Sequence, residues 1–431
     1  MTRAAGWLAA LAALALVRSF LFATLTPPYQ SSDEPWHLDY ARVVSQGRLP
    51  VTGRTRIDPA IVRHDKHVSA DRKLTLYGIT EPPLSRETFQ PPLAYLVPGL
   101  GYRLFGVHGG LIWFRTIDAL LGALLAVLAF AAATRAFPGR PFAGPLAGLA
   151  AVCLPSVGLI ASSANDDVCA AVLAIAALGL AAGLARRGGP LRQYVVLGAL
   201  VGAAGLAKTT GLAVAVPAMV AAAVAPHRGG KVEPRARVAT MAAVLGTAGI
   251  VMLPWVVRNL WVYGDLLGTK AFIVSHPGSR IGGLRLLVAG KPALVGAHRF
   301  WPELGRSAVG VLRWSDLRLA GWAYVLAVLG AAAGTVAVLR WLSKRRRVSA
   351  ADRRAALVVG SAFASMIAAT AWFAMAVDWQ PQGRYLIPSL LGVVGLVGAS
   401  CGRRGFGLAA AVLLALLGAG LVTTARTYGL A

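Results

Sequence analysis

Long apolar segments alternate with short polar connections along most of this 431-residue chain. Each segment is close to the roughly 20 residues that an α-helix needs to cross a bilayer. The windows lie at residues 4–25, 111–134, 142–162, 168–185, 194–207, 209–225, 238–261, 317–340, 355–377, 385–401 and 405–424. Lys208 alone separates the fifth from the sixth. The pattern predicts an all-α polytopic membrane protein, a helical bundle with about 11 transmembrane helices.

The composition supports a membrane protein and argues against a secreted globule, since 57% of the residues are hydrophobic and the mean hydropathy is +0.64. The formal net charge is +26, with 43 basic against 17 acidic residues. Such a charge also suits a nucleic-acid-binding protein, but here the basic residues gather between apolar segments. The clusters are Arg135/Arg140, Arg186/Arg187/Arg192, His227/Arg228/Lys231/Arg235/Arg237, Arg340/Lys344/Arg345/Arg346/Arg347/Arg353/Arg354 and Arg403/Arg404. The positive-inside rule explains them, with anionic membrane lipids as a secondary partner and no nucleic acid.

In this orientation the chain lies in a bacterial plasma (inner) membrane with its amino terminus in the cytoplasm. Two long connections, residues 27–110 and 262–316, then lie outside. The first connection holds eight of the 17 acidic residues, so we expect carboxylate chemistry on the outer face. Residues 91–106 are apolar too, but counting them as a crossing would invert every later loop. They are therefore predicted to form an interfacial helix. Residues 1–431 form a single transmembrane domain in this interpretation.

The run Asp33-Glu34-Pro35-Trp36-His37 follows the first span directly. Ser31-x-x-Glu34 fits a helix capping box, and Asp33 and His37 would share one face of a short helix from Asp33 to about Gln46. The acids then either only complement the helix dipole or do chemistry, with Asp33 as a general base that Glu34 and His37 orient. Asp33 and His37 alone are too few ligands for a metal site.

Several short motifs in this order resemble the GT-C superfamily of membrane glycosyltransferases, which includes protein O-mannosyltransferases and aminoarabinose transferases. They are Asp33-Glu34 with His37 and Tyr40-Ala41, Pro91-Pro92-Leu93-x-Tyr95, Leu206-Ala207-Lys208-Thr209-Thr210-Gly211, Pro254-Trp255-x-x-Arg258-Asn259 with Tyr263-Gly264-Asp265, and Gln382-Gly383-Arg384-Tyr385-Leu386-x-Pro388. The chain is most similar to glycosyltransferase-39-like members of bacterial envelopes. The resemblance implies a GT-C bundle that transfers a hexosyl or pentosyl group from a polyprenyl-phosphate sugar to a lipid, glycan or protein acceptor.

The resemblance also implies roles for individual residues. Asp33 takes the place of the catalytic base, with Glu34 and His37 beside it, while Arg258, Arg384 and Lys208 would hold the donor phosphate and Tyr385 adjoins them. Snorkelling to outer headgroups is the alternative for both arginines. Gln90 stands where many lipid A-modifying relatives have lysine, which argues against a lipid A phosphate acceptor. Tyr95 is expected to be an anchor at the headgroup boundary.

A second acidic pair, Asp166-Asp167, falls on the outer turn between the third and fourth spans. It suits helix capping, recognition of sugar hydroxyls, or a divalent cation, and the sequence leaves these open. Asp118 is expected to pair with Arg115 within one helix. Two other functions remain in view: a transporter or flippase of a lipid-linked saccharide, and an inactive scaffold with this fold.

Overall fold

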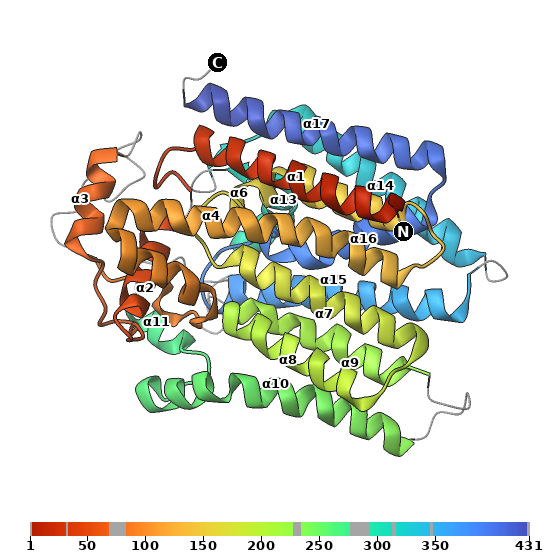
Figure 1. Cartoon of the computed structure of the whole chain (residues 1–431), viewed down its shortest axis with the longest axis horizontal. Helices are drawn as coiled ribbons and strands as arrows, with labels where there is room; N and C mark the ends of the chain where they lie inside the picture. Colours follow the sequence, from red (N-terminus) through yellow and green to blue (C-terminus); the bar gives the residue numbers. More distant parts are fainter. Residues whose placement is uncertain are drawn as a thin grey trace.

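The long helices run roughly along one common axis in the computed structural model (Figure 1). The structure describes residues 2–31, 33–68, 83–226, 234–275, 294–312, 316–344 and 348–428. The α-helices are α1 Thr2–Leu25, α2 Glu34–Ser45, α3 Pro59–Val68, α4 Leu96–Ala136, α5 Ala143–Cys153, α6 Pro155–Ile160, α7 Asp167–Arg187, α8 Leu191–Ala207, α9 Ala215–Val224, α10 Pro234–Tyr263, α11 Thr269–Ser275, α13 Leu294–Val309, α14 Gly321–Ser343, α15 Ala350–Ala376, α16 Ile387–Ser400 and α17 Arg403–Thr427. Short 3-10 helices are η2 Glu87–Phe89, η3 Leu93–Tyr95, η4 Thr209–Val214 and η5 Gly383–Leu386. Strands β1 Val311–Leu312 and β2 Leu317–Arg318 pair antiparallel.

The described residues contain eight helices long and apolar enough to cross a membrane, together with three shorter apolar ones. Every apolar window of the sequence falls on one of these helices or on a pair of them. The chain is thus a multi-pass membrane protein of the predicted all-α class. A total of 11 crossings stays a prediction, because each shorter helix is long enough to cross a membrane only when a neighbouring helix is added to it.

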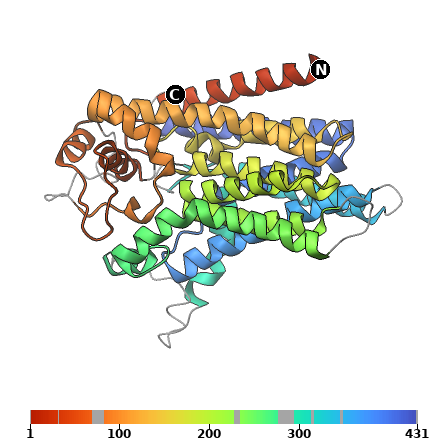
Figure 2. The same ribbon diagram turned by 60° about the horizontal axis from the view of Figure 1, so that its bottom comes forward.

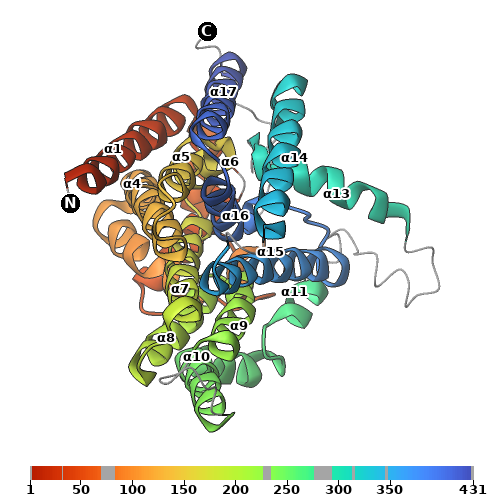
Figure 3. The ribbon, with the colours of Figure 1, turned by 90° about the vertical axis from the view of Figure 1, so that its right-hand side faces the viewer.

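Small residues let the central helices approach one another closely. Within the apolar window of α7, 78% of the residues are buried, against 11% in α14, which lies on the outside of the bundle (Figure 3). A Cβ added to Gly395 of α16 would lie 2.7 Å from the Cβ of Ala133 on α4, and one on Gly148 of α5 would lie 2.4 Å from Leu11. The alanine and glycine content of the spans therefore serves close helix packing, as is usual in membranes.

The predicted interfacial helix at 91–106 is the first part of α4, which is interrupted at Gly106. Gly106 has φ 69°, a value that favours glycine. The chain reverses direction there, as two contacts of Trp113 show. Its Nε1 donates a hydrogen bond to the carbonyl oxygen of Val97 at 3.1 Å, and the Trp113 ring lies over Gly101. Residues 96–105 thus fold back on the start of the following helix and do not extend it as one straight rod.

The two ends of the bundle differ in charge and in content. The amino terminus and the turns after α4, α7 and α16 lie at one end, while α2, α3 and α11 lie at the other (Figures 1 and 2). At the first end, Asp352 is bound by Arg186 at 2.5 Å and Arg140 at 3.6 Å. Basic residues therefore mark the end opposite the long loops.

The two long connections are built differently. Helix α2 of the first packs on α4, and α11 of the second contacts η2. Within residues 262–316, the basic residues Arg280, Arg285, Lys291 and Arg313 lie outside the described residues. The division of the chain into one membrane domain with two long outer loops stays a prediction.

Candidate functional site

The turn between α1 and α2 holds Asp33 in an unusual backbone conformation. Asp33 is the N-cap residue of α2, with φ 65° and ψ 5°, and its side chain makes no capping hydrogen bond. The expected capping box is therefore wrong: Ser31 is buried, and Glu34 is bound elsewhere. A non-glycine residue in the left-handed region is uncommon and costs free energy, although Asp adopts this region more readily than most residues. The Asp33 carboxylate is left 20% exposed, facing the cluster described below.

Glu34 is fully buried and is bound by four donors. Nε and Nη2 of Arg115 on α4 donate to its two carboxylate oxygens at 2.8 Å each. The backbone N–H groups of Tyr29 and Ala164 donate to the same carboxylate at 2.9 Å each. Glu34 thus ties the turn before α2 to α4 and to the turn before α7. These contacts are compatible with the expectation that Glu34 orients Asp33, which stays a prediction.

His37 belongs to a buried hydrogen-bonded chain. Its Nδ1 lies 2.8 Å from the hydroxyl of Tyr95, which donates to Oδ2 of Asp166 at 3.3 Å. The tyrosine proton points to Asp166, so Nδ1 of His37 carries a hydrogen and Nε2 keeps its lone pair. Burial lowers the pKa of His37 to about 3, against the opposing effect of Asp33. The imidazole is therefore neutral at neutral pH.

Tyr95 is completely buried and stacks on Tyr40, with ring centroids 3.8 Å apart. The expectation that Tyr95 anchors the chain at the headgroups is therefore wrong. Because the chain reverses at Gly106, the start of α4 turns towards the interior. The Tyr95 hydroxyl forms its hydrogen bonds there, with His37 and Asp166.

Two cations and three carboxylates meet where α7, η4 and η5 begin. Nζ of Lys208 lies 2.6 Å from Oδ1 of Asp166 and 2.7 Å from Oδ1 of Asp167. Nε of Arg384 lies 3.3 Å from Oδ2 of Asp167, and its Nη2 lies 3.6 Å from Oδ2 of Asp33. Residues from four distant parts of the chain are thus joined in one charged cluster, which includes five of the residues expected from the sequence.

Glu87 of η2 completes the cluster and was not singled out from the sequence. Ligand atoms of Glu87, His37 and Asp166 all lie within 4.8 Å of one another. Burial raises the pKa of Glu87 to about 8, helped by the carboxylates of Asp33 and Asp166. The available signal was its position three residues before Gln90 in the proline motif. One imidazole and two carboxylates form a donor set that suits a divalent cation.

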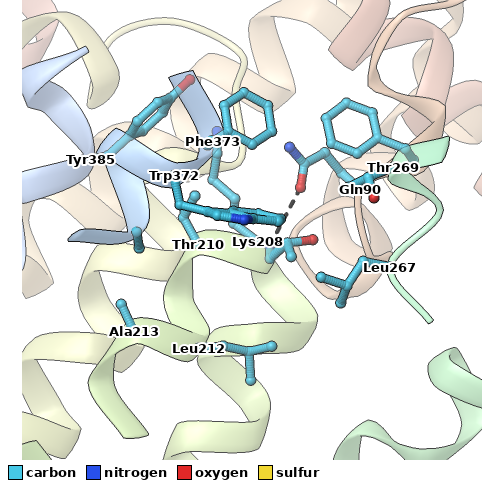
Figure 4. A pocket seen from close by; sticks show the side chains of 13 residues that line it. Gln90, Lys208, Thr210, Leu212, Ala213, Leu267, Thr269, Trp372, Phe373 and Tyr385 are labelled. Carbon is cyan, nitrogen blue, oxygen red and sulfur yellow. Dashed lines mark hydrogen bonds between the residues drawn. The ribbon is translucent and has the colours of Figure 1, made fainter. Parts of the chain in front are cut away.

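A largely apolar cavity of about 160 Å³ begins beside this cluster (Figure 4). Its polar lining consists of Gln90, Lys208, Thr209, Thr210, Thr269 and Tyr385, and its apolar lining of Phe89, Leu212, Ala213, Leu267, Ala369, Trp372 and Phe373. The Tyr385 ring lies 5.0 Å from Nζ of Lys208, and Oε1 of Gln90 accepts a hydrogen bond from the Thr209 N–H at 3.4 Å. Trp372 on α15 is 49% exposed. The cavity therefore runs from buried charges to a side of the bundle that faces lipid.

Two expected interactions differ in the structure. Arg258 stacks between the rings of Trp255 and Tyr263 and donates to the carbonyl oxygen of Pro50, so its contacts lie on the loop rather than in the cluster. Asp118 accepts the N–H of Asn165 at 3.0 Å and does not pair with Arg115, which binds Glu34 instead. The Arg258 expectation came from the resemblance and the Asp118–Arg115 expectation from helical spacing. The partner that Arg115 has instead, Glu34, lies on another element.

Comparisons with known proteins agree with this architecture. The sequence profile of the dolichyl-phosphate-mannose-protein mannosyltransferase family matches residues 89–257. The structure is similar to ArnT from Cupriavidus metallidurans bound to undecaprenyl phosphate, with a TM-score of 0.51, 18% identity, and coverage of 93% of this chain and 62% of that one. The chain has the GT-C fold. The predicted resemblance is thereby confirmed.

A second solved structure leads to the same fold. Archaeal oligosaccharyltransferase AglB from Archaeoglobus fulgidus, in complex with an inhibitory peptide and a dolichol-phosphate, matches with a TM-score of 0.50 and 12% identity over 99% of this chain and 56% of that one. The chain thus spans about three fifths of the length of these solved proteins. Among curated protein sequences, none matches it significantly.

Proposed function

We propose that this protein is an integral membrane glycosyltransferase that moves a sugar from a polyprenyl phosphate to an acceptor on the extracytoplasmic face. One observation carries the proposal: the cluster of Asp33, Lys208 and Arg384 adjoins an apolar cavity that reaches the lipid-facing side. A polyprenyl-phosphate sugar has this same division into an apolar chain and a charged head. ArnT and AglB, whose solved structures hold undecaprenyl phosphate and dolichol-phosphate, support the choice of donor class.

The proposed reaction is a single displacement at the anomeric carbon. The Asp33 carboxylate accepts the proton of an acceptor hydroxyl, and that oxygen attacks the anomeric carbon from the side opposite the phosphate. The bond between the anomeric carbon and the phosphate oxygen breaks, and its electrons leave with the polyprenyl phosphate. The configuration is inverted. Asp33 suits the base because its carboxylate is the more exposed one of the first acidic pair, while all of Glu34 is bound.

Arg384 and Lys208 are assigned to the leaving phosphate. The Arg384 fork matches phosphate oxygens, and preorganised positive charge in a buried site stabilises charge that develops in the transition state. Asp167 lies beside both cations and would hold them in position. Tyr385 and Gln90 border the cavity next to Lys208, so they are assigned to binding the donor head.

The charge balance indicates how a cation would contribute. Asp33, Asp166 and Asp167 outnumber Lys208 and Arg384 by one, so an incoming phosphate would enter a site that is already negative. A divalent cation held by His37, Asp166 and ionised Glu87 would neutralise the negative charge of the site and favour donor binding. The proton transfer and the displacement assigned above are carried out by the protein's own groups.

The orientation of the site belongs to the same proposal. The cluster lies at the end of the bundle opposite the basic turns, so the positive-inside rule places it outside the plasma membrane and the amino terminus in the cytoplasm (Figure 1). The identity of the sugar is assigned only to the hexosyl or pentosyl class. The acceptor is assigned only to the class of envelope lipids, glycans or proteins.

The decisive experiment is incubation of purified protein with candidate polyprenyl-phosphate sugars, followed by mass spectrometry of the lipids. Consumption of one donor with release of polyprenyl phosphate is expected. A flippase would move such a lipid between leaflets of a vesicle without consuming it, and a scaffold would do neither. Either result, obtained across the donor panel with acceptor extracts present, would overturn the proposal.

A further inference from the structure

A pair of histidines lies on the outer loop, separate from the charged cluster. Nε2 of His64 on α3 and Nδ1 of His108 on α4 are 3.3 Å apart. The rings meet at an interplanar angle of 72°, and His108 is exposed. The two residues are 44 positions apart in the chain, so the fold and not the local sequence brings them together.

We propose that His64 and His108 form a binding site for a transition-metal ion such as Zn²⁺. Two nitrogens bound to a tetrahedral zinc at ~2.0–2.1 Å lie about 3.3–3.4 Å from each other, which matches the observed separation. Imidazole is a preferred ligand of zinc, copper and nickel, and water completes the coordination.

Tyr29 supplies the group that orients the first ligand. Its hydroxyl lies 2.7 Å from Nδ1 of His64, and its ring is completely buried. A partner on one ring nitrogen fixes the tautomer, so that the other nitrogen presents its lone pair to the metal. With Nδ1–H donating to Tyr29, Nε2 of His64 faces His108 as a ligand.

The same tyrosine links the metal site to the turn that carries Asp33. The Tyr29 N–H donates to Oε2 of Glu34 at 2.9 Å, and Tyr29 itself has φ 63°. A metal that fixes His64 therefore also restrains the strained segment between Tyr29 and Asp33. We expect the ion to stabilise the outer loop against unfolding, and this effect does not depend on the proposed transferase activity.

Copper binding to the full-length protein, purified with a tag that contains no histidine, tests the site. The His37→Gln variant is used throughout, because it removes the imidazole of the charged cluster. We expect the electron paramagnetic resonance spectrum of Cu²⁺ to report two nitrogen ligands in this background, and one after His108→Gln is added. Zn²⁺ should raise the melting temperature of the His37→Gln protein, and Zn²⁺ affinity should fall at least about tenfold when His64→Gln or His108→Gln is added.

The matched control adds His64→Gln and His108→Gln together to the His37→Gln background and keeps the other four histidines of the chain. Loss of the two-nitrogen signal in this control, with an unchanged melting temperature of the metal-free protein, supports the site. The proposal is overturned by unchanged Zn²⁺ affinity in the control, or by a His37→Gln protein that binds no Zn²⁺. The Tyr29→Phe variant should weaken binding without removing either nitrogen ligand.

Discussion

Oδ2 of Asp33 lies 3.6 Å from Nη2 of Arg384, an ion pair too long for a direct hydrogen bond. The arginine thus attracts the carboxylate without occupying its lone pairs, and its Nε lies 3.3 Å from Oδ2 of Asp167 without forming a hydrogen bond. A base must accept a proton and a phosphate ligand must be able to turn towards an incoming anion. The Asp33–Arg384 pair meets both requirements, and the predictions for Arg384→Lys and Asp33→Asn depend on it.

Replacing Arg384 with lysine should weaken donor binding by roughly tenfold or more, because a point charge replaces a bidentate fork. Binding of a polyprenyl phosphate to purified protein measures the effect. Arg258→Lys is the matched control, since the contacts of Arg258 lie on the loop at Pro50 and Tyr263. Equal losses in the two variants would contradict the assignment of the phosphate to Arg384.

Glu34→Ala should lower the free energy of unfolding by about 3–5 kcal/mol, because it leaves Arg115 buried without its partner. Asp58→Ala is the control: its carboxylate also adjoins an arginine, at 3.6 Å, but is 31% exposed, so about 1 kcal/mol is expected. Thermal unfolding in detergent compares the two. A Glu34→Ala protein as stable as the control would remove its positioning role.

Stability should fall with pH because of Glu87. Its pKa rises from an ordinary value of 4.5 to about 8 in the folded protein, so between these values the folded state binds more protons than the unfolded state. As the pH rises across this interval, the wild-type protein therefore loses stability. The Glu87→Gln variant should not show this loss. The difference in melting temperature between variant and wild type should be larger at pH 8.5 than at pH 5. If the melting temperatures of the variant and the wild type change in parallel with pH, Glu87 is not desolvated.

Chelation should weaken donor binding if His37, Glu87 and Asp166 hold a divalent cation next to the phosphate. Affinity for polyprenyl phosphate is measured after treatment with EDTA and after readdition of Mn²⁺, Mg²⁺ or Zn²⁺. We expect restoration by at least one ion in the wild type and in His108→Gln, and a smaller response in His37→Gln. If EDTA does not change the affinity for polyprenyl phosphate, then no divalent cation takes part, and Lys208 and Arg384 alone neutralise the phosphate.

The sequence predicted the positions of the helices much better than it predicted which residues pair between them. Apolar windows identify spans because each reports on its own length and composition. The reversal at Gly106 could not be seen, since the same stretch also holds Gly99, Gly101, Gly109 and Gly110 and nothing in the sequence singles out this one. The Glu34–Arg115 pair, which crosses 81 positions, displaced the local Asp118–Arg115 pair expected from helical spacing. Glu87 was missed for the same reason, because only the fold brings it to His37 and Asp166.

Labelling of single cysteines tests the orientation. In a variant with Cys153, Cys169 and Cys401 replaced by alanine, Arg63→Cys on α3 should react with an impermeant reagent in intact cells, while Arg187→Cys at the end of α7 should react only after lysis. Both positions are exposed. Positions 291 and 345, which the same reasoning places outside and inside, lie outside the described residues. Labelling of position 187 in intact cells would invert the topology and move the cluster to the cytoplasmic side.

The role of Asp33 as the base is tested most directly by the turnover of Asp33→Asn, measured on the donor identified by mass spectrometry. Asparagine keeps the shape of the side chain and tolerates the left-handed backbone at this position, so folding and donor binding should survive. Loss of a positioned base is expected to reduce turnover by about 10²–10⁴-fold. A stable Asp33→Asn protein that binds donor and turns it over at the wild-type rate would contradict the account.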